Sequence, residues 1–595
     1  MAYPVFAPGG TWFAPNDVTI TRGVITEIEI MDSYMPDDFT TITDSWDASE
    51  AKDGSIICYA IGTKMIIAGN GSGKITLNKN SKGMFSDSDK YTDYFNELTQ
   101  ILNAHLFDFS MVEDAWFFLA YCRKLSYIDV STWDLSNAKN IGAMFSNCNL
   151  LDNIDVTNWN VSNVEWMDSL FNECFSLQNL DLSGWNLKKD NFTLVERGVG
   201  FSQLFLKCSN LTSIGDCSNW DVKCSSMRLM FYGCSKLKNI NLGKIYFNPL
   251  DAQLAMQYPF SGCTELESIA IKSLDFSTNV SLEGLFQNSS KLKNIDLNID
   301  FSKVTDISFM FYGCTGLKEI DVSNWDVSNV TNFDHFAAHA KLKRKGIENW
   351  NTASAINMNA MFHNCAEEEL DLSKFDVSNV KYFCQMFENS PNLKRIKGLE
   401  KWDTSSGVGF DEMFGRCRKL EEVDLSSFDT SKAKNGEKAS ENGHTTNTFS
   451  NIFQECNNLK KITLGPKFSI NGDGTNTSAT KKLTFPTPSA TYIQEADGNW
   501  YDIEGNSYAP DGMLDKTAKT YYAVLSEAFD SDTVPVMVNR GSLTKVAHAL
   551  RKKTGKTGKM KLNSFSEEID SFEGEMLVLD DNTTIEAETL IIGGV

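Results

Sequence analysis

Cysteine is the residue type whose spacing in this chain could support chemistry most directly. Ten of the fourteen cysteines occupy one position of a repeated phrase: Cys122, Cys148, Cys174, Cys208, Cys234, Cys263, Cys314, Cys365, Cys417 and Cys456. Such a column could bind metal ions or form disulfides. However, Ser289, His339 and Ser390 stand at equivalent positions and no C-x-x-C pair occurs. Identical positions of a ladder also rarely have disulfide geometry. We therefore predict thiols packed as small apolar side chains, in a chain that folds in a reducing place.

Tryptophan forms a second column. Seven of the twelve tryptophans recur at one position, and Phe375 and Phe428 continue it: Trp133, Trp159, Trp185, Trp220, Trp325, Trp350 and Trp402. An exposed aromatic stripe could stack on sugar rings, whereas an internal stack would bury a large apolar area. We predict the internal stack.

Aspartates such as Asp155, Asp181 and Asp321 flank these columns. Carboxylate oxygens suit calcium, but no D-x-[DN]-x-[DN]-G loop is present. Asp, Ser and Asn also form local hydrogen bonds in turns, which explains the pattern without an ion. We expect no metal and no cofactor.

No residue set points to catalysis. The six histidines are His105, His335, His339, His363, His444 and His548, and none lies in H-E-x-x-H or beside a G-x-S-x-G turn. The formal net charge of −23 argues against nucleic acid as a partner. No stretch approaches the roughly 18 apolar residues of a membrane span, so membrane insertion is not expected. The sequence thus predicts a protein that is not an enzyme.

The elements that must position these columns follow one repeat. Thirteen anchor residues open it at intervals of 25 to 39 residues: Leu119, Phe145, Phe171, Phe205, Phe231, Phe260, Phe286, Phe311, Phe336, Phe362, Phe387, Phe414 and Phe453. Each unit carries L-x-x-[IL]-x-[VL], whose alternation predicts a short strand. Apolar residues three apart, such as Val380, Phe383 and Met386, predict one or two helical or 3₁₀ turns. Stacked units would share one continuous core and form a parallel ladder.

The residues expected in that core share the repeat positions just described. They are Phe145, Cys148, Leu151, Ile154, Trp159, Phe171, Cys174, Phe311, Cys314, Leu317 and Trp325. The fold class predicted is an α/β repeat: a solenoid with a parallel β-ladder and short helical or 3₁₀ turns, flanked by small β-rich modules.

The phrase F-x-x-C-x-x-L-x-x-I followed by D-[VL]-S-x-[WF]-D-x-S-x-[VA] resembles the BspA-type leucine-rich repeats of bacterial surface proteins. It is most similar to the variant of about 25 residues found in mycoplasma lipoproteins. Residues Phe311 to Phe336 match it most fully. The resemblance covers roughly residues 95–465 and implies a leucine-rich-repeat solenoid used for attachment or protein binding.

The ends differ from the repeat. Residues 1–94 are predicted to form a β-rich docking or capping module, residues 95–465 the solenoid, residues 466–530 a small β-rich module, and residues 531–595 a segment of helix and strand. A helix with Phe95, Leu98 and Leu102 on one face is predicted at the start of the solenoid. A second short helix is predicted from Leu543 to Leu550. The stretch from Leu543 to Ile569 resembles a segment of tail and baseplate proteins of phages of Gram-positive bacteria.

Together these features predict a non-enzymatic receptor-binding protein of a phage virion, at the tail tip, baseplate or a fibre, assembled in the host cytoplasm. Two alternatives stay open: a structural virion decoration or head fibre, and a bacterial cell-surface adhesin of the same repeat class. The expected partners are a host cell-surface protein or glycan and other virion proteins. A homo-oligomer is expected, with a trimer suggested by analogy with virion fibres.

Overall fold

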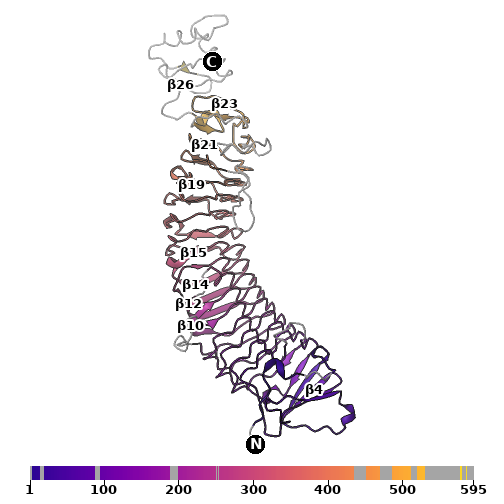
Figure 1. The fold of residues 1–595 in the computed structure, drawn as a ribbon. Helices are drawn as coiled ribbons and strands as arrows, with labels where there is room; N and C mark the ends of the chain where they lie inside the picture. Colours follow the sequence, from indigo (N-terminus) through magenta and orange to yellow (C-terminus); the bar gives the residue numbers. More distant parts are fainter. Residues whose placement is uncertain are drawn as a thin grey trace.

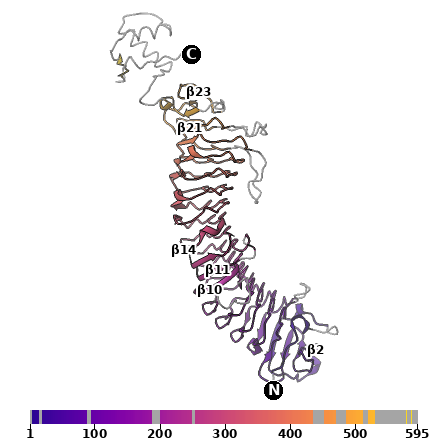
Figure 2. The same ribbon diagram turned by 60° about the vertical axis from the view of Figure 1, so that its left-hand side comes forward.

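The computed structural model describes residues 3–13, 19–86, 94–187, 199–248, 251, 253–433, 451–468, 485–510, 519–528, 577–578 and 584–585. The described chain forms one curved stack of units that runs from the N-terminal sheet to the C-terminal β-rich residues (Figures 1 and 2). The repeat solenoid predicted from the sequence is therefore present. The predicted helix from Leu543 to Leu550 lies outside the described residues.

The N-terminal end of the stack is a six-stranded sheet. Its strand order is β2-β3-β4-β1-β6-β8, with β2, β3 and β4 antiparallel and β4, β1, β6 and β8 parallel. The bounds are β1 Glu27–Met31, β2 Asp44–Asp47, β3 Ile57–Ile61, β4 Lys64–Ala68, β6 Gln100–Leu102 and β8 Tyr127–Ile128. A further parallel pair joins β5 (Ile75–Thr76) to β7 (Phe107–Asp108). The last strands of this sheet already belong to the first repeat units, so the sheet closes the N-terminal end of the ladder.

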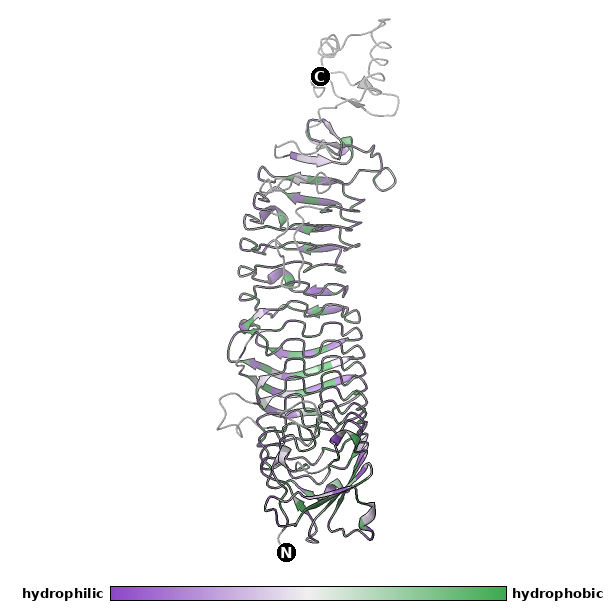
Figure 3. Cartoon of the chain, turned by 45° about the vertical axis from the view of Figure 1, so that its right-hand side comes forward, coloured by the Kyte–Doolittle hydropathy of each residue, from purple (hydrophilic) through white to green (hydrophobic). Residues whose placement is uncertain are grey.

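The middle of the ladder is a parallel sheet in the order β14-β12-β11-β10-β9. Its bounds are β9 Val199–Gly200, β10 Cys217–Ser226, β11 Asn239–Phe247, β12 Ser268–Phe276 and β14 Asn294–Ile299. Shorter parallel pairs follow: β13 (Val280–Ser281) with β15 (Val304–Asp306), β16 (Glu319–Asp321) with β17 (Lys343–Lys345), and β18 (Glu369–Asp371) with β19 (Arg395–Lys397). Figure 3 shows these rungs lying one above another.

The C-terminal end is closed by antiparallel strands. β20 (Glu422–Leu425) pairs in parallel with β21 (Lys461–Leu464), and β24 (Lys519–Tyr522) then adds antiparallel to β21. β22 (Trp500–Tyr501) and β23 (Ser507–Tyr508) complete the sheet, and β25 (Leu577–Val578) pairs with β26 (Thr584–Ile585). An antiparallel strand ends a parallel ladder because it does not offer the edge that another repeat would extend.

The described residues contain 3₁₀ helices and turns but no α-helix. The 3₁₀ helices are η1 Gly9–Thr11, η2 Arg22–Val24, η3 Phe39–Thr41, η4 Ala104–Leu106, η6 Phe301–Lys303, η7 Ile347–Asn349, η8 Leu399–Lys401 and η10 Leu525–Ala528. The predicted helix through Phe95, Leu98 and Leu102 is wrong, because Leu102 lies in β6. Pairing with β1 and β8 satisfies the backbone there instead.

The segment around each anchor residue is a turn rather than a helix. We call it the Phe corner, from two residues before the anchor to two residues after it. In the unit of Phe387, Gln385 and Asn389 have φ angles of 57° and 55°, which interrupt any helix. The N–H groups of Gln385, Phe387 and Asn389 donate instead to carbonyls of the following unit at 2.7–2.8 Å. The corner is therefore a second inter-unit ladder, beside the strand ladder.

One predicted anchor is displaced by a residue. His335 has the positive φ of the position two before an anchor, and Phe311 N–H donates to Phe336 O. Elsewhere this N–H reaches the residue before the next anchor, as Phe286 reaches Met310. Ala337 is thus the anchor of this unit, and Ala340 stands at its cysteine position. Phe336 and His339 were assigned to these positions from the sequence, which is wrong by one residue.

The thiol column has a role beyond packing. Cys174, Cys314 and Cys417 Sγ each donate to the carbonyl of the preceding unit's anchor, at 3.1, 3.0 and 3.0 Å. Ser289 and Ser390 make the same bond at 2.9 and 3.0 Å, which explains why serine replaces cysteine. All fourteen cysteines are buried and free, and burial raises the pKa of the Cys174 thiol to about 12. These thiols are donors within the core.

We expect Cys314→Ser to change the free energy of unfolding by less than about 1 kcal/mol, because the hydroxyl keeps the bond to Phe286 O. Cys314→Val should cost about 1–3 kcal/mol, because the buried carbonyl then loses its donor. Urea denaturation followed by tryptophan fluorescence measures both. Equal stability of the two variants would contradict the donor role.

Candidate binding surfaces

The core positions expected from the repeat lie where the stack needs them. Phe145, Cys148, Leu151, Ile154, Trp159, Phe171, Cys174, Phe311, Cys314 and Leu317 are buried, and Trp325 is half-buried against them. Anchor rings such as Phe145 and Phe171 stack with centroids 5.7 Å apart. Residues at these positions are consumed by packing between units, so they are not available to a ligand.

The tryptophan column is internal. Trp133, Trp159 and Trp185 are at most 2% exposed and stack with centroids 6.4 Å apart. The indole N–H groups of Trp159 and Trp185 each donate to a carbonyl of the preceding unit at 3.1 Å. The column thus cannot serve as a sugar-stacking stripe.

The aspartate ladder caps turns. Asp155 Oδ1 accepts from the backbone and hydroxyl of Thr157, and Asp321 Oδ1 accepts in the same way from Ser323. Among the described residues, no group of three or more His, Cys, Asp or Glu side chains is placed to hold a metal ion. Nor does the described part of the chain include a helix with the length and apolarity to cross a bilayer.

The Phe corner carries the residues that vary from unit to unit. At two positions, two before and two after each anchor, the backbone is left-handed with φ between 48° and 75°. Only some of these residues are glycine, although glycine adopts this conformation at the lowest cost. The inter-unit hydrogen bonds of the corner hold the others in place. Different side chains are therefore displayed at fixed spacing along one edge of the stack.

Aromatic rings and imidazoles gather on this edge in three consecutive units. The rings of Phe309 and His335 are stacked with centroids 5.0 Å apart. Tyr312 lies 5.2 Å from His339, whose ring lies 4.4 Å from that of His363. We call Phe309, Tyr312, His335, His339 and His363 the imidazole cluster. His339 is exposed, whereas His363 is 8% exposed.

The electrostatics keep two of these imidazoles neutral. Burial, followed by the nearby His339 and His335, lowers the pKa of His363 to about 4. Burial and His335 also lower the pKa of His339. His363 Nε2 lies 3.7 Å from Glu388 Oε2, while the buried Nδ1 of His363 has no hydrogen-bond partner. The cluster therefore presents planar, uncharged rings near neutral pH.

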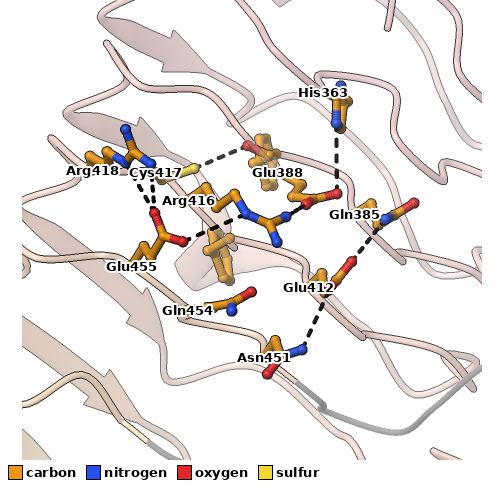
Figure 4. Close-up of polar contacts among 12 residues, drawn as sticks. His363, Gln385, Glu388, Glu412, Arg416, Cys417, Arg418, Asn451, Gln454 and Glu455 are labelled. Carbon is orange, nitrogen blue, oxygen red and sulfur yellow. Dashed lines mark hydrogen bonds and ion pairs between the residues drawn. The ribbon is translucent and has the colours of Figure 1, made fainter.

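A chain of alternating charges continues the edge beyond the cluster (Figure 4). Glu388 pairs with Arg416, whose Nε lies 3.8 Å from Glu455 Oε1, and Arg418 Nη2 lies 2.6 Å from Glu455 Oε2. Burial, then the charge of Glu412, raises the pKa of Glu388, and Arg416 opposes both. This network holds together the units that follow the imidazole cluster.

A buried ion pair lies beneath the same units. Arg344 occupies the strand position that Ile320 fills in the preceding rung, and Glu367 occupies a leucine position. Arg344 Nη2 lies 2.9 Å from Glu367 Oε2, and the guanidinium carbon lies 4.9 Å from the centre of the Phe362 ring. Burial raises the pKa of Glu367, but Arg344 more than offsets this, so the pKa is lower than usual. Ala337 and Ala340, small residues at the anchor and cysteine positions, go with this substitution of charge for apolar bulk.

Sequence reasoning missed both the imidazole cluster and the ion pair. The histidines were interpreted as variable solenoid positions, and Arg344 and Glu367 were not singled out. The detectable signal was the departure of this unit from the repeat, with alanine, arginine and glutamate at positions that are elsewhere Phe, Cys, Ile and Leu.

The strand face offers a second surface. A groove of about 600 Å³ lies across β11, β12, β14 and β16, with Asn239, Ser268, Asn294, Asp296 and Glu319 in its lining. The edge of β14 is not hydrogen-bonded to β16. The lining is rich in amides, hydroxyls and carboxylates, which suit hydrogen bonding with a polar ligand.

Beyond the groove the charges of successive rungs alternate in sign. The exposed or half-exposed residues of β16 to β21 and of the residue before each strand are, in rung order, Glu319 and Asp321; Lys343 and Lys345; Glu368, Glu369 and Asp371; Lys394, Arg395 and Lys397; Glu421, Glu422 and Asp424; Lys460 and Lys461. We call this the striped face. Lys318, beside the first rung, is an exception. Several pairs link neighbouring rungs, such as Lys345 with Asp321 at 2.7 Å and Lys394 with Glu368 at 2.8 Å.

The sequence profile of one protein family, described as "Mycoplasma protein of unknown function, DUF285", matches the chain in four segments. They are residues 79–196, 193–252, 254–369 and 358–463. Among solved structures, a leucine-rich-repeat protein of Leptospira interrogans is similar with 11% identity and a TM-score of 0.21, over 60% of this chain and 84% of that one. The TLR13–ssRNA13 complex is similar with 15% identity and a TM-score of 0.21, over 59% of this chain and 46% of that one. No curated protein matches the chain.

Acidification should destabilise the chain through His363. Between pH 6.5 and about 4 the unfolded chain binds a proton there that the folded chain excludes, so the free energy of unfolding falls as the pH falls. The full effect is about 2–3 kcal/mol. Glu388, with its raised pKa, acts in the opposite direction, so the comparison is between wild type and His363→Gln, which share Glu388. Urea denaturation at several pH values should give a shallower pH dependence for the variant, and parallel curves would contradict the assignment.

Removing one partner of the buried pair should be costly. Glu367→Leu leaves the Arg344 guanidinium buried without its carboxylate, and we expect a loss of about 3–5 kcal/mol in unfolding free energy. The double variant Arg344→Ile with Glu367→Leu restores the residue types of the other units and should lose less than the single variant. Thermal and urea denaturation measure both, and a double variant as unstable as the single one would refute the coupling.

Proposed function

The chain belongs to the family described as "Mycoplasma protein of unknown function, DUF285", whose profile covers most of residues 79–463, and we propose that it is a non-enzymatic adhesion protein that binds a cell surface through the outside of its solenoid. The observation that carries this proposal is the contrast between the inside and the outside of the units. Inside, the same Phe, Cys and Trp positions recur; outside, the corner and strand positions change from one unit to the next. A long surface of fixed spacing and varied chemistry suits recognition of an extended partner.

The imidazole cluster is the proposed contact site. Planar rings with polar edges are over-represented where proteins bind partners, because they bury much area with little loss of conformational freedom. Tyr312 and His339 offer such rings at the edge of the stack, and the neighbouring Asp334, Glu388 and Gln385 offer hydrogen-bonding groups. The partner proposed is a cell-surface protein or glycan of the host.

Nothing in the described site supports a reaction. The imidazoles of the cluster lie against rings, carboxylates and one another, and no serine, threonine or cysteine nucleophile hydrogen-bonds to them in the described residues. Binding without turnover is accordingly proposed.

We propose a phage virion as the carrier of this adhesin. The support is the sequence of residues 543–569 alone, which lies outside the described residues. Attachment to other virion proteins would leave the solenoid free to reach the host.

The test is binding of fluorescently labelled full-length chain to whole Gram-positive cells, with competition against phage adsorption. The double variant Tyr312→Ala with His339→Ala should reduce binding at least about tenfold, the effect expected when hot-spot side chains are removed. Asn324→Ala, an exposed position of the same unit outside the corner, is the matched control and should bind as wild type. Circular dichroism should show all three chains equally folded.

Pretreatment of the cells separates the two partner classes. Protease should abolish binding if the partner is a protein, and periodate should abolish it if the partner is a glycan. Undiminished binding by the double variant would refute the contact site. Absence of binding to every strain that the phage infects would refute adhesion itself.

A further inference from the structure

The striped face is complementary to itself. From β16 to β21 its six rungs read negative, positive, negative, positive, negative, positive, with Lys318 as the exception. A sequence of alternating signs with an even number of members reverses into its opposite. Two copies that meet head to tail therefore bring every negative rung against a positive one.

The two possible symmetric arrangements differ in energy. If the two-fold axis runs along the stack, each rung meets the same rung of the other copy, and like charges face each other. If the axis runs parallel to the strands, midway between β18 and β19, the rung of Glu369 meets that of Arg395. The rung of Lys343 then meets that of Glu422, and the rung of Glu319 meets that of Lys461. Only the second arrangement places opposite charges together.

The charges inside one chain are not exhausted by their own ion pairs. Within the described residues, Glu319, Lys343 and Lys461 take part in no ion pair within 4.0 Å, although neighbouring rungs do. Glu319 and Lys461 belong to the outermost rungs, which lack a charged rung on one side. These are the rungs that the second arrangement brings against each other.

We infer that two copies of this chain associate through the striped face, antiparallel, with the two-fold axis between β18 and β19. The surface is accessible, because the side chains of Lys345, Lys397 and Arg395 are 67%, 62% and 50% exposed. Six rungs about 4.8 Å apart and about five residues wide give roughly 500 Å² per copy. That is smaller than the roughly 800 Å² of a standard interface, so the dimer is weak and sensitive to salt. Such pairing would also double the number of binding edges on one particle.

Thiol cross-linking tests this geometry, because all native cysteines are buried. Two full-length variants are made, Lys343→Cys and Glu422→Cys, each with a single exposed thiol. In the antiparallel dimer these positions face each other across the axis, and neither faces itself. A short bis-maleimide should therefore link the mixed variants into a dimer while leaving each variant alone largely monomeric.

Salt and mass complete the test. Raising NaCl from about 20 mM to about 500 mM should reduce cross-linking of the mixture at least about fivefold. Sedimentation of the unmodified chain at low salt should show a species of twice the mass of one chain. Efficient cross-linking within each single variant would overturn the antiparallel arrangement. Equal products in mixed and separate samples, salt-independent cross-linking, or a monomer at low salt would overturn the inference, whether or not the chain binds cells.

Discussion

The backbone N–H groups of each Phe corner donate to carbonyls of the next unit, and the rest of the structure depends on this bonding. Left-handed residues on both sides of the anchor turn these groups along the axis of the stack. A thiol or hydroxyl then donates to the anchor's own carbonyl, as Cys314 and Ser390 do. Buried backbone groups are costly when unpaired. Each unit can therefore be satisfied only by its neighbours, which makes the stack cooperative along its length.

Because the interior is held by repeated positions, the exterior is free to vary. The potentially reactive residue types, cysteine and tryptophan, lie inside and serve packing and hydrogen bonding. The outside carries three surfaces of different character: the corner with its rings, the groove across β11 to β16, and the striped face. One edge for a ligand and another for a second copy would not compete for the same residues.

The unit of Ala337 departs from the repeat, and its substitutions compensate one another. Ala337 and Ala340 remove bulk, the Arg344 guanidinium lies against Phe362, and Glu367 neutralises it. Violations of a local pattern often mark functional positions, because a merely structural unit would have kept the common residues. The imidazole cluster lies on the outside of these units, which is the reason for preferring it as the contact site.

The sequence by itself determined the existence of the stack, its period and its internal columns, because spacing and residue type recur with each unit. It also indicated that Asp321 caps a turn rather than binding an ion, since Asp-x-Ser hydrogen bonding is local. Only the tertiary structure decided that the corners are not helical. That outcome depends on N–H groups choosing a neighbouring unit over their own, which no local pattern reveals. It also decided that Ala337 replaces Phe336 as an anchor, that Arg344 meets Glu367, and that three histidines converge. These contacts join residues of different units, and their partners are fixed only once the register between units exists.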